Sequence, residues 1–224
     1  MTLSILGRCE RTGMLGMAIA SSSIAVASRC AFAQAGVGVV ASQNVTDPGL
    51  GPAGLALLGE GLDAKTALAT LLAQTKHAEY RQIAILDADG QSGQFSGDKA
   101  LGCHATANGE NCVAAGNMLG NEMVCRAMVD SFAGSRSTLP GRLLSALEAG
   151  LVAGGEAGPV HSAGLKIAHV QPWPYIDLRV DWLDLGPVAE LRALWQRYEP
   201  QAEDYTARAL DPASAPSYGV PGDE

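Results

Sequence analysis

Short apolar runs and helix-type stretches follow one another along the chain in pairs. Residues 2–9 and 14–20 have the alternating pattern of two strands, and the Glu-Arg-Thr-Gly sequence between them is typical of a turn. Residues 25–35 carry little signal and fit a loop or a short helix, and residues 97–111 are predicted to be irregular. Further strands are predicted at 36–43, 81–87, 91–96, 112–115, 162–170 and 175–182.

Helices are predicted between these strands from apolar residues spaced three and four positions apart. Asp63 stands where the N-cap of one helix belongs, and Pro187 suits the first position of another. The helices are expected at 52–59, at 63–74, from Leu119 to Phe132, from Leu139 to Leu151, and at about 187–198.

This order of elements predicts a mixed α+β fold. Strands and helices each come in pairs, unlike the strand–helix alternation of a doubly wound parallel sheet. Paired strands bury one face against another sheet and the other under helices, so we expect a four-layer αββα sandwich with largely antiparallel sheets. One domain is expected over residues 1–198. Residues 199–224 are charged and rich in proline, which predicts an extended or loosely attached C-terminal tail.

Composition and charge narrow the class of protein. Hydrophobic residues make up 47% and charged residues 17% of the chain, which is typical of a globular protein. The formal net charge is −8 and basic residues do not cluster, so no nucleic-acid partner is expected. No apolar run reaches the length of about 18 residues that spans a membrane, so no membrane partner is expected. The five cysteines lack CxxC spacing and no secretory leader is recognised, which favours a cytoplasmic protein.

Metal and nucleotide sites find no support in the spacing of candidate ligands. The four histidines do not stand at metal-ligand spacing from cysteine or acidic residues. No glycine-rich phosphate-binding motif follows any expected strand. We therefore expect no cofactor and no metal.

The first strand carries the most specific chemical signal. If the initiator methionine is removed, Thr2 opens a strand with a free α-amino group. A threonine hydroxyl needs a base before it attacks a carbonyl, and an α-amine with a pKa of about 8 can serve as that base. The alternative is that Thr2 only begins an edge strand. Ser4 lies two residues on, on the same strand face, and is either a second candidate nucleophile or an ordinary strand hydroxyl.

Two strand ends supply further candidates. Gly116 and Asn117 precede a helix, where a backbone N–H and the Asn117 amide could stabilise an oxyanion, or where Asn117 could cap the helix. Ser42 and Gln43 precede a loop with two prolines and two glycines, which is either a pocket wall that binds substrate or an ordinary turn.

A third pair of candidates, Arg81 and Gln82, opens a predicted strand. A guanidinium can bind a carboxylate through two parallel hydrogen bonds, so Arg81 is a candidate for holding a substrate. The alternative for Arg81 is a surface ion pair.

Short motifs spread over residues 2–195 resemble the bacterial family called domain of unknown function 1028. The resemblance implies an αββα sandwich of the N-terminal nucleophile (Ntn) hydrolase-like type, but no activity, since the family has none established. The motifs are Thr2-Leu3-Ser4-Ile5, Ala41-Ser42-Gln43, Gly51-Pro52-Ala53-Gly54-Leu55, Arg81-Gln82, Gly116-Asn117-Met118-Leu119, Arg142-Leu143-Leu144-Ser145-Ala146-Leu147, Gly154-Gly155-Glu156, Ser162-Ala163 and Asp177-Leu178-Arg179-Val180-Asp181.

Two segments depart from the family pattern. Ala115 stands where glutamine is expected before Gly-Asn-Met, and residues 156–163 replace an expected acidic-basic-glycine stretch before Gln-Ser-Ala. If those polar groups line the family's pocket, the chemistry of this chain is altered or lost.

Two functions of different classes follow. The first is hydrolysis of an amide bond in a small polar substrate, with Thr2 as nucleophile, its amine as base and Asn117 at the oxyanion, while Arg81 or Gln43 orients the substrate. The alternative is a non-catalytic, oligomeric small-molecule-binding or scaffold protein that retains the fold.

The expected partners are a small-molecule substrate and further copies of the chain. A homo-oligomer, a dimer or higher, is expected because tryptophans are concentrated late in the chain, where an apolar face could pair across a two-fold axis. These tryptophans are Trp173, Trp182 and Trp195.

Overall fold

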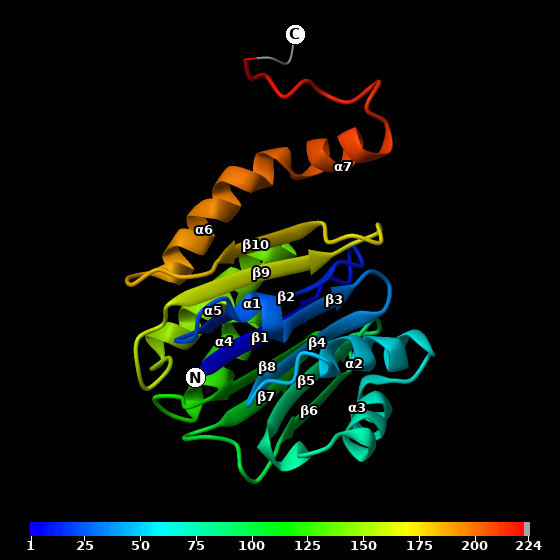
Figure 1. Ribbon diagram of the computed structural model, residues 1–224. Helices are drawn as coiled ribbons and strands as arrows, with labels where there is room; N and C mark the ends of the chain where they lie inside the picture. The colour runs from blue at the N-terminus through cyan, green and yellow to red at the C-terminus, as the bar shows by residue number, and fades with distance from the viewer. Residues whose placement is uncertain (222–224) are drawn as a thin grey trace.

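Two antiparallel sheets form the centre of the protein, whose computed structural model describes residues 1–221 (Figure 1). The first sheet is six-stranded, in the order β10-β9-β2-β1-β8-β7, and the second is four-stranded, in the order β3-β4-β5-β6. All the paired strands within these sheets are antiparallel. The predicted mixed α+β class with antiparallel sheets is therefore confirmed.

The strands agree closely with the apolar runs of the sequence. The first sheet contains β1 (Thr2–Arg8), β2 (Leu15–Ser21), β7 (Ala105–Gly109), β8 (Cys112–Asn117), β9 (Ser162–Ala168) and β10 (Ile176–Val180). The second sheet contains β3 (Ala31–Gln34), β4 (Gly38–Asn44), β5 (Arg81–Asp87) and β6 (Ser92–Ser96).

The helices begin where the sequence supplies caps or proline. Asp63 caps α3, because its Oδ1 accepts hydrogen bonds from the amides of Lys65 and Thr66 at 2.9 and 3.0 Å. Pro187 occupies the first turn of α6. The α-helices are α1 (Val26–Cys30), α2 (Leu50–Gly59), α3 (Ala64–Gln74), α4 (Met123–Gly134), α5 (Leu139–Val152), α6 (Pro187–Tyr198) and α7 (Ala202–Leu210), with 3₁₀ turns at Ala78–Tyr80 and Glu199–Gln201.

Three apolar clusters hold these elements together. One lies between the first sheet and helices α4, α5 and α6, and includes Phe132 and Leu143. A second lies between the two sheets, and a third lies between the second sheet and helices α2 and α3. These clusters therefore join the first sheet to helices, the two sheets to each other, and the second sheet to helices.

Strand β1 shows how alternation distributes side chains between these clusters. Leu3 and Ile5 belong to the cluster under α4 and α5, whereas Leu6 belongs to the cluster between the sheets. Because successive side chains of a strand point to opposite faces, Thr2 and Ser4 face the second sheet together with Leu6.

Two segments differ from the sequence-based prediction. Residues 105–109, predicted to be irregular, form strand β7 at the edge of the first sheet. Its sequence, Ala-Thr-Ala-Asn-Gly, has no large apolar side chain, so alternation leaves no signal, and pairing with β8 sets its conformation. Residues 25–35, predicted to be a loop or short helix, divide into α1 and β3.

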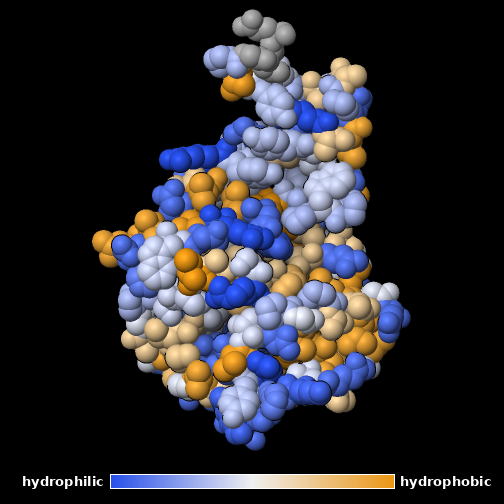
Figure 2. Space-filling view, in the orientation of Figure 1, coloured by the Kyte–Doolittle hydropathy of each residue, from blue (hydrophilic) through white to orange (hydrophobic). Residues whose placement is uncertain are grey.

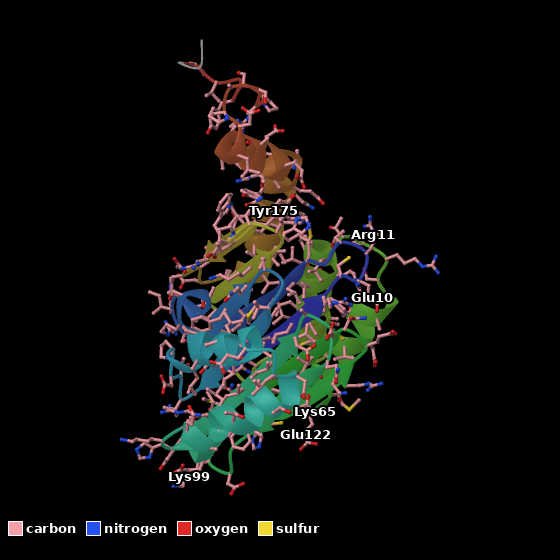
Figure 3. The ribbon with its side chains drawn as sticks, turned by 90° about the vertical axis from the view of Figure 1, so that its right-hand side faces the viewer. Glu10, Arg11, Lys65, Lys99, Glu122 and Tyr175 are labelled. Carbon is pink, nitrogen blue, oxygen red and sulfur yellow. The ribbon has the colours of Figure 1, made fainter. Side chains whose placement is uncertain are left out.

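The predicted C-terminal tail, residues 199–224, contains helix α7, which follows α6 and extends beyond the sheets, whereas α6 packs against β9 and β10 (Figure 1). The Tyr175 hydroxyl donates a hydrogen bond of 2.8 Å to Glu203 Oε1, and the Tyr198 and Tyr205 rings stack 5.5 Å apart. Tyr175 lies where this extension meets the body of the protein (Figure 3). Residues 222–224 of the predicted tail lie outside the described residues. No helix within residues 1–221 combines the length and apolar character needed to cross a membrane.

Close packing of β1 against the helices predicts the effect of one added methyl group. A Cβ at Gly7 would lie 2.6 Å from Phe132 Cε2 and 3.1 Å from Leu143 Cδ2, so Gly7→Ala should lower the free energy of unfolding by about 1–3 kcal/mol. Urea unfolding measures this. The control is Gly59→Ala in α2, where a Cβ meets nothing within 4 Å and helix propensity should improve. Equal stability of Gly7→Ala and wild type would contradict this packing.

Candidate functional site

One end of the space between the sheets is lined by polar side chains. In the first sheet, neighbouring strands are in register there, with Thr2 opposite Asn117 and Ser21 opposite Ser162. In the second sheet, Gln82 is paired with Gln43 on one side and with Ser96 on the other. All of these side chains except Ser96 are buried. The space between the sheets is therefore apolar over most of its extent and polar at the end where β1 begins.

Gln82 connects the two sheets within this polar end. Its Nε2 donates to the Gly116 carbonyl of β8 at 2.9 Å and to Ser96 Oγ at 2.9 Å. Its Oε1 accepts from Gln43 Nε2 at 2.8 Å and from Asn117 Nδ2 at 3.0 Å. A backbone carbonyl can only accept, so the bond to Gly116 requires that the Nε2 end of the Gln82 amide faces the Gly116 carbonyl.

The orientation of the Gln82 side-chain amide determines the orientations of the side-chain amides of Asn117 and Gln43. Because Gln82 Oε1 accepts, Asn117 must present its Nδ2 to it and turn its Oδ1 away. That Oδ1 is buried and has no hydrogen-bond partner within residues 1–221. Gln43 in turn presents Oε1 to the hydroxyl of Ser4, which donates to it at 3.0 Å. Through this bond, Ser4 joins the hydrogen-bond network that Gln43 forms with Gln82.

The Thr2 hydroxyl lies beside the peptide bond that joins it to Met1. Thr2 Oγ1 donates to the Met1 carbonyl oxygen at 2.5 Å, and Ser21 Oγ donates to the same oxygen. Thr2 Oγ1 and Ser21 Oγ are 3.4 Å apart. Two hydroxyls from adjacent strands therefore converge on one carbonyl group at the start of β1.

A carboxyl group from a distant part of the chain completes this region. Glu156 Oε2 accepts a hydrogen bond of 3.0 Å from the Ser22 amide, while Oε1 is buried and has no partner within residues 1–221. Burial raises the pKa of Glu156 to about 7, against the opposing effects of the amino-terminal ammonium and of the Ser22 hydrogen bond. The amino-terminal ammonium therefore favours the ionised form of Glu156.

Other predicted site residues lie on the opposite face of the second sheet. Ser42 and Arg81 alternate with Gln43 and Gln82, so they lie on the face that carries α2 and α3. Ser42 Oγ donates to the Asp47 carbonyl at 2.8 Å, and Arg81 Nη1 donates to the Val45 carbonyl. The structure brings Thr2, Ser4, Asn117, Gln43, Gln82 and the Gly116 carbonyl together, and it places Ser42 and Arg81 apart from them.

Ser21 and Glu156 were not among the predicted site residues. The signal for Ser21 was present, since it ends β2 on the strand face that looks towards the second sheet, as Thr2 does at the start of β1. Glu156 follows two glycines in a loop after α5, and neither pattern nor spacing connects it with the amino terminus. Within residues 1–221, no group of three or more His, Cys, Asp or Glu side chains is arranged to hold a metal ion.

Comparison with protein families gives a match over residues 2–191 to a model described as a family of unknown function, DUF1028. The chain belongs to this family. A crystal structure of a DUF1028 protein from Silicibacter pomeroyi is similar to it, with 30% sequence identity, a TM-score of 0.85, and coverage of 91% of this chain and 89% of that chain. The search of curated proteins gave no match.

A second solved structure is far more distant from this DUF1028 chain. It is Anbu, an ancestral beta-subunit from Yersinia bercovieri, with 12% identity, a TM-score of 0.37, and coverage of 91% of this chain and 96% of that chain.

The hydrogen bonds of Gln82 predict a large loss of stability for an apolar replacement of similar length. Gln82→Met leaves the Gly116 carbonyl and the amides of Gln43 and Asn117 without this partner, so the free energy of unfolding should fall by about 3 kcal/mol or more. Urea unfolding of Gln82→Met and wild type measures this fall in the free energy of unfolding. Gln94→Met, at an exposed position of the neighbouring strand β6, is the control and should change stability by less than about 0.5 kcal/mol. Similar effects of both substitutions would contradict the role of Gln82.

The raised pKa of Glu156 predicts a pH dependence of stability. Between pH 4.5, its ordinary pKa, and about 7, the folded protein retains the proton and the unfolded chain loses it, so stability falls as pH rises. The Glu156 contribution to this fall is of the order of 3 kcal/mol. Unfolding measured from pH 4 to 8 should show that Glu156→Gln removes this part of the slope, whereas Glu122→Gln, at an exposed carboxylate labelled in Figure 3, keeps it. Parallel profiles for Glu156→Gln and wild type would contradict the raised pKa.

Proposed function

We propose that this DUF1028 protein is an amide hydrolase with an Ntn hydrolase-like αββα fold, in which Thr2 acts after Met1 has been removed. The observation that carries the proposal is the convergence of the Thr2 and Ser21 hydroxyls on the carbonyl group attached to the Thr2 nitrogen. A substrate carbonyl in that position is within reach of the Thr2 hydroxyl and of a second hydrogen-bond donor.

The neighbouring side chains suit the separate parts of this reaction. The α-amine of Thr2 takes the proton of Oγ1 while Oγ1 forms a bond to the substrate carbonyl carbon, and Ser21 Oγ donates to the oxyanion. The carbon–nitrogen bond then breaks, and the departing amine takes the proton from the α-ammonium. Water hydrolyses the resulting ester, which restores the Thr2 hydroxyl and releases the acid.

Asn117 suits the amine better than the oxyanion. Asn117 lies opposite Thr2 in the sheet, and the buried atom that lacks a partner is the acceptor Oδ1. An acceptor there can receive a hydrogen bond from the α-amine of Thr2 and so direct its lone pair towards Oγ1. We assign Asn117 to the amine, and Gln82, Gln43 and Ser4 to the support of this arrangement.

The second candidate function is a non-catalytic binding or scaffold protein. It is favoured by the bond from Thr2 Oγ1 to the Met1 carbonyl, because a chain that keeps Met1 has neither a free α-amine on Thr2 nor a free hydroxyl. A cytoplasmic homo-oligomer remains our proposal in either case. Apolar side chains reach the surface in several places (Figure 2), and Trp182 and Leu185 are among the exposed ones.

The proposed hydrolase activity is measured with protein that is released from a cleavable fusion, which makes Thr2 the first residue. Intact mass verifies the terminus, and release of ammonia from a panel of carboxamides measures turnover. Thr2→Ala should lower turnover by at least about a thousandfold, and Thr2→Ser should retain part of it. Protein that keeps Met1 is the control and should be inactive. Equal turnover by wild type and Thr2→Ala would exclude Thr2 as nucleophile and direct attention to Ser4.

A further inference from the structure

Met1 fills a defined space at the start of β1. Its carbonyl oxygen accepts hydrogen bonds from Thr2 Oγ1 and Ser21 Oγ, and the residue is partly buried. Its side chain lies against Gly158, where a Cβ would be 2.9 Å from Met1 Cε and 3.5 Å from Met1 Sδ. Removal of Met1 therefore leaves a space with a carbonyl-binding end and an apolar end.

The charged group beside this space is Glu156. Glu156 is only 7% exposed, the Met1 ammonium acts to lower the pKa of its carboxyl group, and its Oε1 has no hydrogen-bond partner within residues 1–221. An unpaired buried carboxylate oxygen is costly, and a cationic donor would offset that cost. The position that the Met1 ammonium now influences is therefore suited to an ammonium group of a ligand.

Glu156 and Gly158 also line a cavity of about 550 Å³ between the end of α5 and the start of α6. Its other walls are largely apolar, and they include Leu151, Val160 and Val188. The volume is in the range of small-molecule sites. Gly158 borders both this cavity and the Met1 side chain, so the cavity lies next to the space that an apolar chain replacing Met1 would fill.

We propose that the space vacated by Met1 is the acyl subsite of the enzyme, and that the substrate is an amide of an α-amino acid with a free amino group and an unbranched apolar side chain. This inference rests on the proposed function. The substrate carbonyl lies next to the place of the Met1 carbonyl, in non-bonded contact with the Thr2 α-amine, its ammonium lies beside Glu156, and its side chain passes Gly158. Hydrolysis consumes one water and yields the free amino acid and the departing amine, so no further reactant is required.

The proposed subsite is tested by measuring ligand binding to a variant that lacks the Thr2 hydroxyl. Thr2→Ala protein that begins at residue 2 is titrated calorimetrically with L-methionine amide, N-acetyl-L-methionine amide and glycinamide. L-Methionine amide should bind at least about tenfold more tightly than either of the other two ligands. The N-acetyl derivative lacks the positive charge, and glycinamide lacks the side chain. Thr2→Ala protein that retains Met1 should bind none of them, because Met1 fills the subsite.

Two variants in the same background assign the contacts. Glu156→Gln should bring the affinity for L-methionine amide down to that for its N-acetyl derivative, while Glu122→Gln should leave it unchanged. Gly158→Ala places a methyl group against the position of the Met1 side chain. It should therefore weaken the affinity for L-methionine amide several-fold and leave the affinity for glycinamide unchanged.

The outcomes separate this subsite from the proposed function. Equal affinity for L-methionine amide and its N-acetyl derivative, or binding that persists when Met1 is retained, would overturn the subsite. Turnover of only N-acylated or acidic amides by the Thr2-first enzyme would also overturn it and would leave the hydrolase intact. Binding as expected, together with no turnover by the Thr2-first enzyme, would support the subsite and exclude the hydrolase.

Discussion

The hydrogen bond from Gln82 Nε2 to the Gly116 carbonyl organises the polar end of this protein. It crosses from the second sheet to a backbone group of the first, so it is sensitive to how the two sheets lie on each other. Because the carbonyl cannot donate, it determines the direction of the Gln82 amide and then those of Gln43 and Asn117. The network leaves one acceptor, Asn117 Oδ1, unsatisfied beside Thr2. Buried acceptors without partners are rare in native structures, and they are expected where a ligand or reacting group will bind.

The apolar cluster between the sheets determines how the two sheets are positioned at this polar end. Val39, Ala41 and Leu86 pack against Leu6 and Ile19 of the first sheet and set the spacing between the two sheets. The polar side chains stand two or four strand positions beyond this cluster, where they are buried. A site supported by strands of two sheets is more rigid than a site on a loop, and hydrogen bonds between the sheets limit its movement further.

Sequence alone could predict the strands but only part of the site. Strand β5 was predicted with its observed ends because Ile83 and Ile85 alternate with Ala84 and Leu86 in an uninterrupted apolar run. Strand β7 was missed because small side chains give no such pattern. Alternation also places Thr2 and Ser4 on one face, yet it does not say which face of β5 meets them. That required the stacking of the sheets, which puts Gln82 inside and Arg81 outside.

Glu156 illustrates a relation that no local pattern encodes. The loop after α5 brings its carboxyl group to the Ser22 amide and to the amino terminus, more than a hundred residues earlier in the chain. A buried carboxyl group with one unpaired oxygen lowers the stability of the folded protein, whereas an apolar residue would avoid the cost. Stability therefore does not account for a carboxyl group here. Our proposal that Glu156 recognises a positive charge does account for it, and the amino-terminal ammonium is a charge that acts on Glu156 in the folded chain. In the proposed function Met1 must leave before Thr2 can react, and in the proposed subsite the contacts of Met1 outline what should bind in its place.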